Sequence, residues 1–291
     1  SDAQLAAAVS NAGGLGIISA MNLNADYLRE QIRKCRTLTD KPFGVNVMLM
    51  SPFVKDVAQV CAEEKPAVVT TGAGLPNLYM KDWLAAGIRV IPVVPSTAMA
   101  RLVERAGAFA VIAEGGESGG HIGDLSTITL VPQVKDAVSI PVIAAGGIGD
   151  GRGVAAALML GAEGVQCGTV FLCSTECTIH DNYKQKVLSA KDIDTIVTGK
   201  RLGHAVRSIR SPFTRKYAKL EYEIQTTGEE LEQMGVGALR KAALDGDIEN
   251  GCFIAGQCSA MVNEIRPARE IIETMFAQAE TLLKGAPVWV K

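Results

Sequence analysis

The chain has 291 residues, of which 48% are hydrophobic and 21% are charged, and its net charge is −2. These values suit a globular protein with a sizeable core, built as one large domain or as one domain with an insertion. The near balance of 29 basic and 31 acidic residues, without a dense basic cluster, argues against a nucleic-acid partner. Since no apolar run approaches the roughly 18 residues of a membrane span and no signal peptide opens the sequence, we expect a cytoplasmic protein without a membrane partner.

The seven cysteines are scattered along the chain and form no CxxC pair. Cys173 and Cys177 lie four residues apart, but no second pair of ligands follows them, which argues against a zinc site. Reduced, buried thiols in a cytosolic protein are the simplest interpretation. We therefore expect no metal.

The predicted elements begin with a helix within residues 1–14, capped by Ser1 or Asp2 and stopped by Gly13 and Gly14. Short runs rich in valine and isoleucine then alternate with amphipathic stretches, at a spacing of roughly 20 to 30 residues. Runs that are apolar throughout predict strands buried on both faces of a parallel sheet. The expected strands are residues 15–19, 43–49, 67–72, 89–95, 109–115, 141–147 and 164–171.

This alternation predicts an α/β fold, specifically a (β/α)8 TIM barrel with a small inserted cap domain. Because a helix precedes the first of only seven expected strands, we expect strand 1 of the barrel to lie upstream of the given sequence. The alternation stops near residue 172, and a long amphipathic helix is expected over 264–285 with Pro267 near its first turn. We therefore predict a barrel domain over residues 1–198, a cap or substrate domain over 199–262, and a C-terminal segment, 263–291, whose helix returns to the barrel.

Glycines follow the expected strands 7 and 8, where barrels of this kind often bind a phosphate. Gly146 and Gly147 end strand 7, and Gly168 with Thr169 belongs to strand 8. Glycine lets backbone N–H groups approach an anion closely, and the start of the helix that follows strand 7 favours negative charge. These glycines could instead only make tight turns, but their presence after both expected strands favours a phosphate site.

The stretch AEGGESGGHIGD, residues 113–124, places His121 in a glycine-rich loop after strand 6, and Glu114 ends that strand. A functional role for His121 is favoured over that of a structural loop histidine. A polar residue within an apolar strand needs a partner or a ligand, which favours ligand contact for Asn46 and leaves Thr70 open. His180 is expected to be structural, and the role of His204 stays open.

The stretches GGHIG (119–123), IAAGGI (143–148) and QCGT (166–169) together resemble the superfamily of FMN-dependent nitronate monooxygenases and enoyl reductases. The similarity extends over essentially the whole chain. The segment DIDTIVTGKRLGHAVR (192–207) and the long insertion are closer to the FabK-type enoyl-[acyl-carrier-protein] reductases. The resemblance thus implies FMN as cofactor and NADH or NADPH as co-substrate. The sequence does not distinguish the two nicotinamides, because it contains no Gly-x-Gly-x-x-Gly unit with an acidic partner.

The reductase resemblance implies reduction of a trans-2-enoyl thioester on acyl carrier protein, the last step of each fatty acid elongation cycle, by a homodimer. It implies that His121 is the active-site histidine and that Ser118 replaces a usual alanine. Nitronate monooxygenase is the alternative, and a non-enzymatic flavin- or phosphate-binding barrel is a distant third. The implied phosphate contacts are Gly146, Gly147, Gly168 and Thr169, and the other implied cofactor contacts are Asn46, Thr70, Glu114, Ser118, Gly119, Gly120, Ala145 and Gln166.

Overall fold

The computed structural model describes residues 1–21 and 23–285. Parallel strands form one curled sheet, and the seven expected strands are confirmed. Each strand pairs with the next one along the chain, except that β5 pairs with β7 because β6 (Gly120–His121) belongs to a second sheet. Within the described residues, β1 and β8 are not paired with each other, so the sheet is open between them. The strands are β1 (Gly16–Ser19), β2 (Phe43–Met48), β3 (Val68–Gly72), β4 (Arg89–Val94), β5 (Val111–Glu114), β7 (Val142–Ala145) and β8 (Gly164–Gln166).

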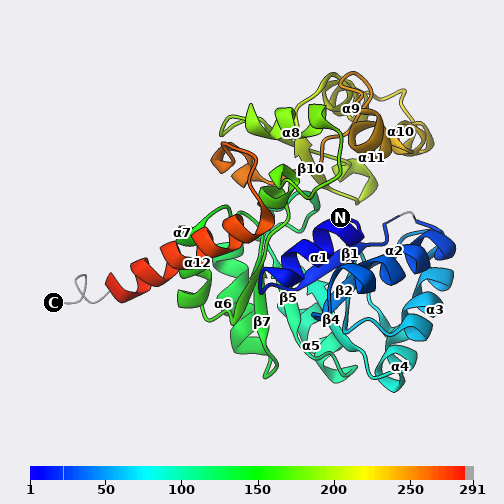
Figure 1. The fold of residues 1–291 in the computed structure, drawn as a ribbon. Helices are drawn as coiled ribbons and strands as arrows, with labels where there is room; N and C mark the ends of the chain where they lie inside the picture. The colour runs from blue at the N-terminus through cyan, green and yellow to red at the C-terminus, as the bar shows by residue number, and fades with distance from the viewer. Residues whose placement is uncertain (22, 286–291) are drawn as a thin grey trace.

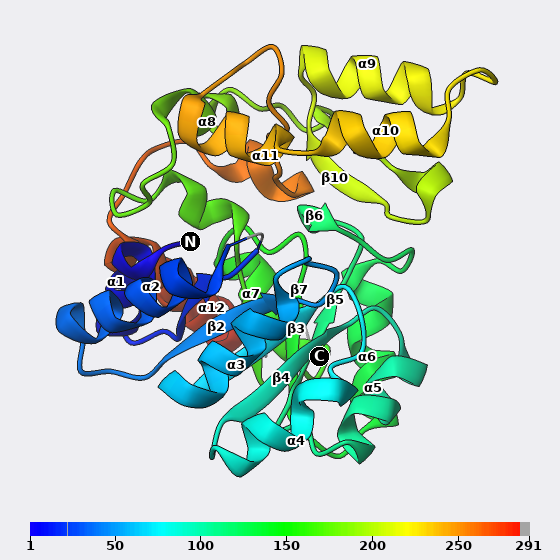
Figure 2. The ribbon, with the colours of Figure 1, turned by 90° about the vertical axis from the view of Figure 1, so that its right-hand side faces the viewer.

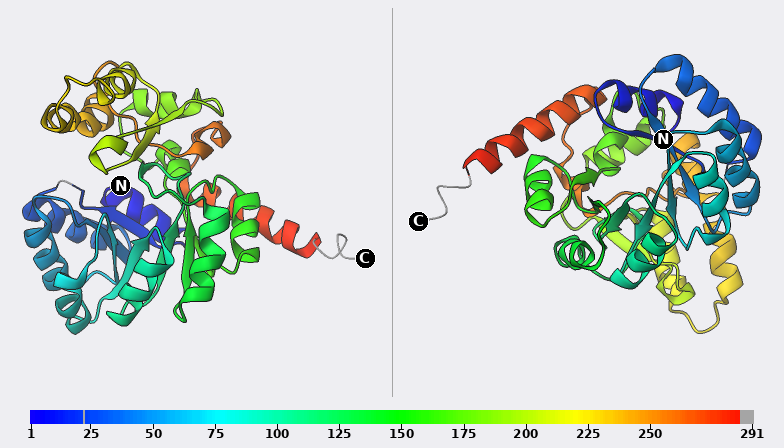
Figure 3. Two further views of the ribbon diagram at one scale, coloured as in Figure 1. Left: turned by 180° about the vertical axis from the view of Figure 1, so that it is seen from behind. Right: turned by 90° about the horizontal axis from the view of Figure 1, so that it is seen from below.

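Helices cover the outside of this sheet, as the view from below shows (Figure 3). The first is capped as the sequence suggests, because the Asp2 carboxylate accepts hydrogen bonds from the N–H groups of Gln4 and Leu5, both at 3.1 Å. The barrel helices are α1 (Ala3–Asn11), α2 (Ala25–Leu38), α3 (Val54–Glu64), α4 (Asn77–Ala85), α5 (Thr97–Arg105), α6 (Thr127–Ala137) and α7 (Gly151–Met159).

The sheet separates two apolar clusters, which explains why its strands are apolar throughout. Outward-facing side chains such as Val45, Val69 and Val90 pack with the helices in the main core. The inward-facing side chains form a smaller cluster inside the curl of the sheet. It comprises Val68, Ile91, Ala110, Ile112 and Ala145.

The expected strand over 164–171 is wrong at its C-terminal end. β8 stops at Gln166, and Thr169–Cys173 forms a 3-10 helix instead. The N–H of Gly256 donates to Thr169 Oγ1 at 2.9 Å, so a contact with a distant segment holds this turn. The buried Val170 serves the core equally well in a helical turn, which is why the apolar pattern could not separate the two structures.

A second part of the chain lies above the carboxyl ends of the barrel strands (Figures 1 and 2). Here β6 (Gly120–His121), from the loop after β5, pairs with β10, giving an antiparallel sheet in the order β6-β10-β9. We call the part from β9 to α11 the cap; the domain boundaries at 198/199 and 262/263 remain a proposal. Its elements are β9 (Thr195–Thr198), β10 (Val206–Ile209), α9 (Pro212–Glu221), α10 (Gly228–Gly235) and α11 (Ala238–Arg240).

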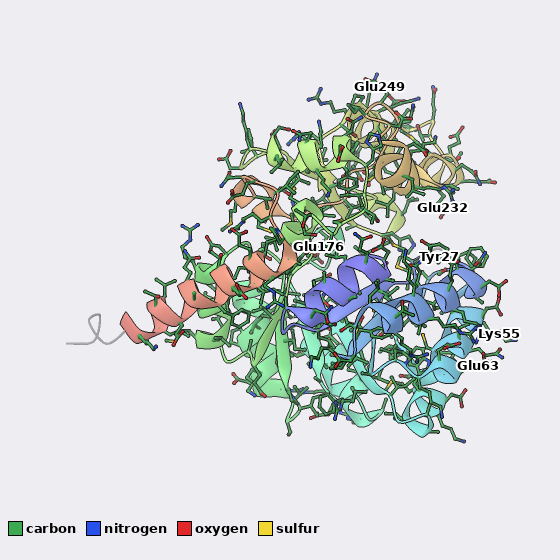
Figure 4. All side chains as sticks on the ribbon, in the orientation of Figure 1. Tyr27, Lys55, Glu63, Glu176, Glu232 and Glu249 are labelled. Atoms are coloured by element: carbon green, nitrogen blue, oxygen red, sulfur yellow. The ribbon has the colours of Figure 1, made fainter. Side chains whose placement is uncertain are left out.

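Along the chain, α8 (Asp181–Leu188) lies between the barrel and the cap, and α12 (Ala268–Gly285) is the helix that packs on the barrel after the chain has left the cap. α12 starts directly after Pro267, four residues later than expected, and packs along α7. The N–H of Ala268 donates to Glu176 Oε2 at 3.0 Å, close to the place where the chain leaves the barrel (Figure 4). No helix in residues 1–21 and 23–285 has both the length and the apolar character to cross a membrane.

Candidate active site

One group of predicted site residues lies on the inner face of β2 and β3. Thr70 follows Val68 by two positions and therefore faces the interior, and Asn46 is its register partner. Thr70 Oγ1 donates to Asn46 Oδ1 at 2.9 Å, so the threonine has a protein partner. The Asn46 side-chain N–H groups donate to no atom of the described chain, which leaves them available to a ligand. Ser19 lies in register beside Asn46, a neighbour that the sequence did not suggest.

A second group continues the inner face on β5, β7 and β8, where Glu114, Ala145 and Gln166 are in register. Burial raises the pKa of the Glu114 carboxyl to about 7, and the nearby Ser118 hydroxyl opposes part of this rise. Ser118 Oγ is itself buried and meets hydrogen-bond geometry with no described atom. Glu114 is therefore protonated in a substantial fraction of molecules at neutral pH, so it can donate as well as accept.

The two glycine loops lie side by side, because β7 and β8 are neighbours. The N–H groups of the four predicted phosphate contacts, Gly146, Gly147, Gly168 and Thr169, donate to no acceptor in the described residues. A Cβ atom on Gly168 would have no neighbour within 4 Å, so there is open space beside this loop. Unpaired donors next to open space fit an anionic group such as the FMN phosphate.

Gly146 has a second reason to be glycine. Its φ of +100° is unfavourable for other residues, and a Cβ there would lie 2.8 Å from both Gly115 O and Thr127 Oγ1. Thr127 Oγ1 also donates to Gly146 O at 2.9 Å. The loop after β7 is thus shaped by direct contact with the turn that follows β5.

Close packing accounts for part of the glycine-rich stretch around His121. A Cβ on Gly119 would lie 2.6 Å from the carbonyl carbon of Ala255, and the N–H of Gln257 donates to Glu117 O at 2.9 Å. The Glu117 carboxylate accepts from Thr127 N at 2.9 and 3.0 Å and so caps the start of α6. Gly119 therefore has a packing role, whereas Gly120, with φ of +91°, allows the chain to turn into β6.

His121 lies in the short strand β6, opposite Val206 of β10, and the N–H of Ile122 donates to Ala205 O at 3.0 Å. Burial lowers the pKa of the His121 imidazole, and the charge of His204 lowers it further. The imidazole is therefore neutral at pH 7. His121 thus joins the barrel loop to the cap, which the sequence did not predict.

Arg207 is a further residue of this region that sequence reasoning did not identify, although it lies in the GHAVR stretch. Its Nε donates to Gly116 O at 2.9 Å and its Nη1 to Thr195 Oγ1 at 3.0 Å, which ties β10 to the turn before His121. Burial lowers the pKa of its guanidinium, and the charge of Glu117 opposes this. By contrast, His180 has the expected structural role, because its Nδ1 accepts the N–H of Asn182 and caps α8.

The chain matches the family model described as nitronate monooxygenase over residues 1–278. Among solved structures, FabK from Thermotoga maritima is 50% identical with a TM-score of 0.96, and the match covers 99% of this chain and 92% of that one. Nitroalkane oxidase from Streptomyces ansochromogenes is 30% identical with a TM-score of 0.86, over 97% of this chain and 94% of that one.

Two curated relatives match at similar identity. One, from Mycobacterium tuberculosis, is named (3aS,4S,5R,7aS)-5-hydroxy-7a-methyl-1-oxo-octahydro-1H-indene-4-carboxyl-CoA dehydrogenase and is 34% identical over 99% of this chain and 92% of its own length. The other, from Staphylococcus aureus, is named a probable nitronate monooxygenase and is 33% identical over 97% of this chain and 92% of its own. With the family model matching residues 1–278, these relatives show that the chain belongs to the nitronate monooxygenase family.

Proposed function

We propose that this protein is an FMN-dependent enoyl-[acyl-carrier-protein] reductase that uses NADH or NADPH. The observation that carries the proposal is the 50% identity to Thermotoga maritima FabK over 99% of the chain, against 30% for the nitroalkane oxidase. Members of this superfamily are oxidoreductases and FMN-dependent flavoproteins. The acyl carrier protein as partner, a cytoplasmic location and a homodimer belong to the same proposal.

The cofactor would be held by polar groups that face the inside of the sheet and by backbone N–H groups that donate to no acceptor in the described residues. The backbone N–H groups of the loops after β7 and β8 suit its phosphate, and the free amide of Asn46 and the carboxyl of Glu114 suit the polar edges of its ring and ribityl chain. FMN, when bound, supplies the hydride transfer between the nicotinamide and the enoyl group. The protein itself needs only to bind and orient the cofactor and the reactants and to stabilise the charge that develops.

His121 would stabilise the charge that develops on the substrate. Hydride addition to the β-carbon of an enoyl thioester places negative charge on the thioester oxygen, and one proton must then reach the α-carbon. Because its pKa is lowered, the imidazole is neutral at pH 7 and its N–H can donate a hydrogen bond to that oxygen. A neutral donor is suitable here, because the hydrogen bond strengthens as the oxygen becomes negative.

The proposal is tested by two half-reactions measured separately without oxygen. We expect NADH or NADPH to bleach the flavin of the purified protein, and crotonyl thioester to restore its yellow colour with formation of butyryl thioester. If the nicotinamide bleaches the flavin but crotonyl thioester does not restore its colour, the protein is not an enoyl reductase. The proposed flavin site would still stand.

Nitronate monooxygenase is the second candidate, favoured by the family model and by the name of the Staphylococcus aureus relative. The same barrel and histidine would then oxidise alkyl nitronates with oxygen, and no nicotinamide would be needed. The Mycobacterium tuberculosis relative, whose name contains a carboxyl-CoA group, supports thioester chemistry instead. Oxygen consumption with an alkyl nitronate but no bleaching by either nicotinamide would select the monooxygenase.

A further inference from the structure

The turn between β9 and β10, residues 199–204, lies next to His121. Val206 pairs with His121 and Ala205 O accepts the N–H of Ile122, so the turn ends one residue before the backbone contact with the candidate active site. The effect of the His204 charge on His121 agrees with this proximity. In Figure 2, β6 lies beneath β10, between the barrel and the cap. The 199–204 turn therefore belongs to the rim of the site.

This turn is rigidly built around a buried carboxylate. Glu221 of α9 is only 1% exposed, and its carboxylate accepts the N–H of Gly199 at 3.1 Å and the N–H of Arg201 at 2.9 Å. The Arg201 guanidinium donates back to the Glu221 and Glu223 carbonyl oxygens. Gly199 has a φ of +81°, and a Cβ on it would lie 2.4 Å from His204 O. A buried charge is costly unless it is bonded in this way, so the turn has a defined shape.

The outward side of the turn is basic. Lys200 and His204 are exposed, and no ion pair of the described residues involves the Lys200 amine. Residues 199–220 contain no aspartate or glutamate. The basic residues of this segment are Lys200, Arg201, Arg207, Arg210, Arg215, Lys216 and Lys219. The outward side of the turn next to His121 thus presents exposed basic side chains, while the nearby carboxylate that bonds the turn, Glu221, is buried beneath it and Lys219 is paired with Glu223.

We propose that the 199–204 turn is a phosphate-binding subsite, in which Lys200 and His204 bind a phosphate ester on the part of a substrate that stays outside the barrel. The inference rests on the proposed function, because both reactants of that reaction carry such groups. The arm that links an acyl thioester to its carrier contains a phosphate ester, and a nicotinamide dinucleotide contains a pyrophosphate. Either molecule must place its reacting end near His121 while its phosphate lies at the rim.

Binding without turnover tests the subsite. Titration calorimetry on the flavin-loaded protein gives the Kd of coenzyme A and of NADP+ for the wild type, Lys200→Gln, and the double variant Lys200→Gln/His204→Gln. We expect the Kd of one ligand to rise about fivefold in the single variant and about tenfold in the double variant, and the difference to shrink at high salt. The ligand whose Kd rises identifies the source of the phosphate. Lys216→Gln, which removes an exposed lysine of α9 outside the turn, is the matched control and is expected to change the Kd of neither ligand by more than about twofold.

A second variant tests the turn itself. Glu221→Gln keeps the side-chain volume but removes the charge that holds the backbone of the turn, and we expect the same ligand to bind more weakly in a protein whose circular dichroism is unchanged. The inference is overturned if neither ligand binds the wild type, or if Lys200→Gln and Lys216→Gln have the same effect. Because no turnover is needed, these outcomes are independent of whether crotonyl thioester is reduced.

Discussion

Two titratable side chains near the mouth of the barrel have pKa values displaced in opposite directions by burial. His121 is shifted toward its neutral form, and Glu114 is shifted toward its protonated, and therefore also neutral, form. Both shifts follow from removing a charged group from water. At neutral pH the site accordingly presents an imidazole that favours its neutral form and a carboxyl that is partly protonated, so both groups can donate hydrogen bonds to a substrate that acquires charge during reaction.

For His121, replacement by alanine separates catalysis from folding. We expect His121→Ala to fold, to keep its flavin and to accept hydride from NADH, because that half-reaction creates no oxyanion on the substrate. Reoxidation by crotonyl thioester should slow by about 100-fold or more, the usual cost of losing one oxyanion donor. Stopped-flow absorbance of the flavin measures both steps. His180→Asn, which keeps a capping side chain on α8 away from the site, serves as control. Reoxidation at the wild-type rate would make His121 a spectator.

For Glu114, the raised pKa predicts a dependence of stability on pH. The carboxyl binds its proton more tightly in the folded state, at about 7, than in the unfolded state, near 4.5. The contribution of the Glu114 proton to the free energy of unfolding is therefore fully present below about pH 4.5, and it is lost as the pH rises through 7. We expect the unfolding free energy of the flavin-free protein to fall by on the order of 2 to 3 kcal/mol more in the wild type than in Glu114→Gln between pH 5 and 8. Urea denaturation at several pH values in this range measures the unfolding free energy of both proteins. If it depends on pH in the same way for the wild type and for Glu114→Gln, the pKa of Glu114 is not raised.

At the scale of elements, the glycines of the two loops differ in whether they can be replaced by alanine without loss of stability. Gly146 has positive φ and backbone atoms of the neighbouring turn beside it, whereas Gly168 has a φ of −111° and open space. We expect Gly146→Ala to destabilise the flavin-free protein by about 2 kcal/mol or more. Gly168→Ala should leave that stability within about 0.5 kcal/mol but weaken FMN binding, because its methyl group would occupy the space beside the free N–H groups.

Thermal unfolding of the flavin-free variants and fluorescence titration with FMN separate these two effects. Gly285→Ala, at the end of α12 and away from the loops after β7 and β8, is the control, since its Cβ would also have no neighbour within 4 Å. Unchanged FMN affinity in Gly168→Ala would place the phosphate elsewhere, whatever the stability of Gly146→Ala.

At the scale of the whole molecule, the last helix closes the structure onto a barrel helix far away in sequence. The N–H of Gly151, the first residue of α7, donates to Gln278 Oε1 of α12 at 2.8 Å. A Cβ on Gly151 would lie 2.4 Å from Met275 O, so the two helix backbones approach closely. We expect Gly151→Ala to lower the unfolding free energy by about 2 to 4 kcal/mol, as overpacking against backbone does.

Urea denaturation followed by circular dichroism measures this loss. Gly235→Ala at the end of α10, where a Cβ meets no atom within 4 Å, is expected to be neutral. Equal stability of the two variants would mean that α12 can move away from α7 at little cost.

By itself, the sequence determined the seven strands, their parallel order and the two glycine loops, because each of these is written in local patterns. Strands buried on both faces are apolar throughout, and glycines follow strands where the backbone must turn tightly. The same local pattern failed beyond Gln166, where an apolar run served a 3-10 helix equally well.

Only the tertiary structure decided how the candidate site is assembled. It joined Asn46 to Thr70, paired β6 with β10 of the cap, and placed Arg207 on the turn that precedes His121. These contacts link residues 24 to 91 positions apart or join strands from different parts of the chain. The pKa shift of Glu114 likewise arises from burial, which depends on the packing of the whole chain around it. No local pattern encodes such pairings, because many partners of similar polarity would satisfy the same residue until the fold brings one of them within reach.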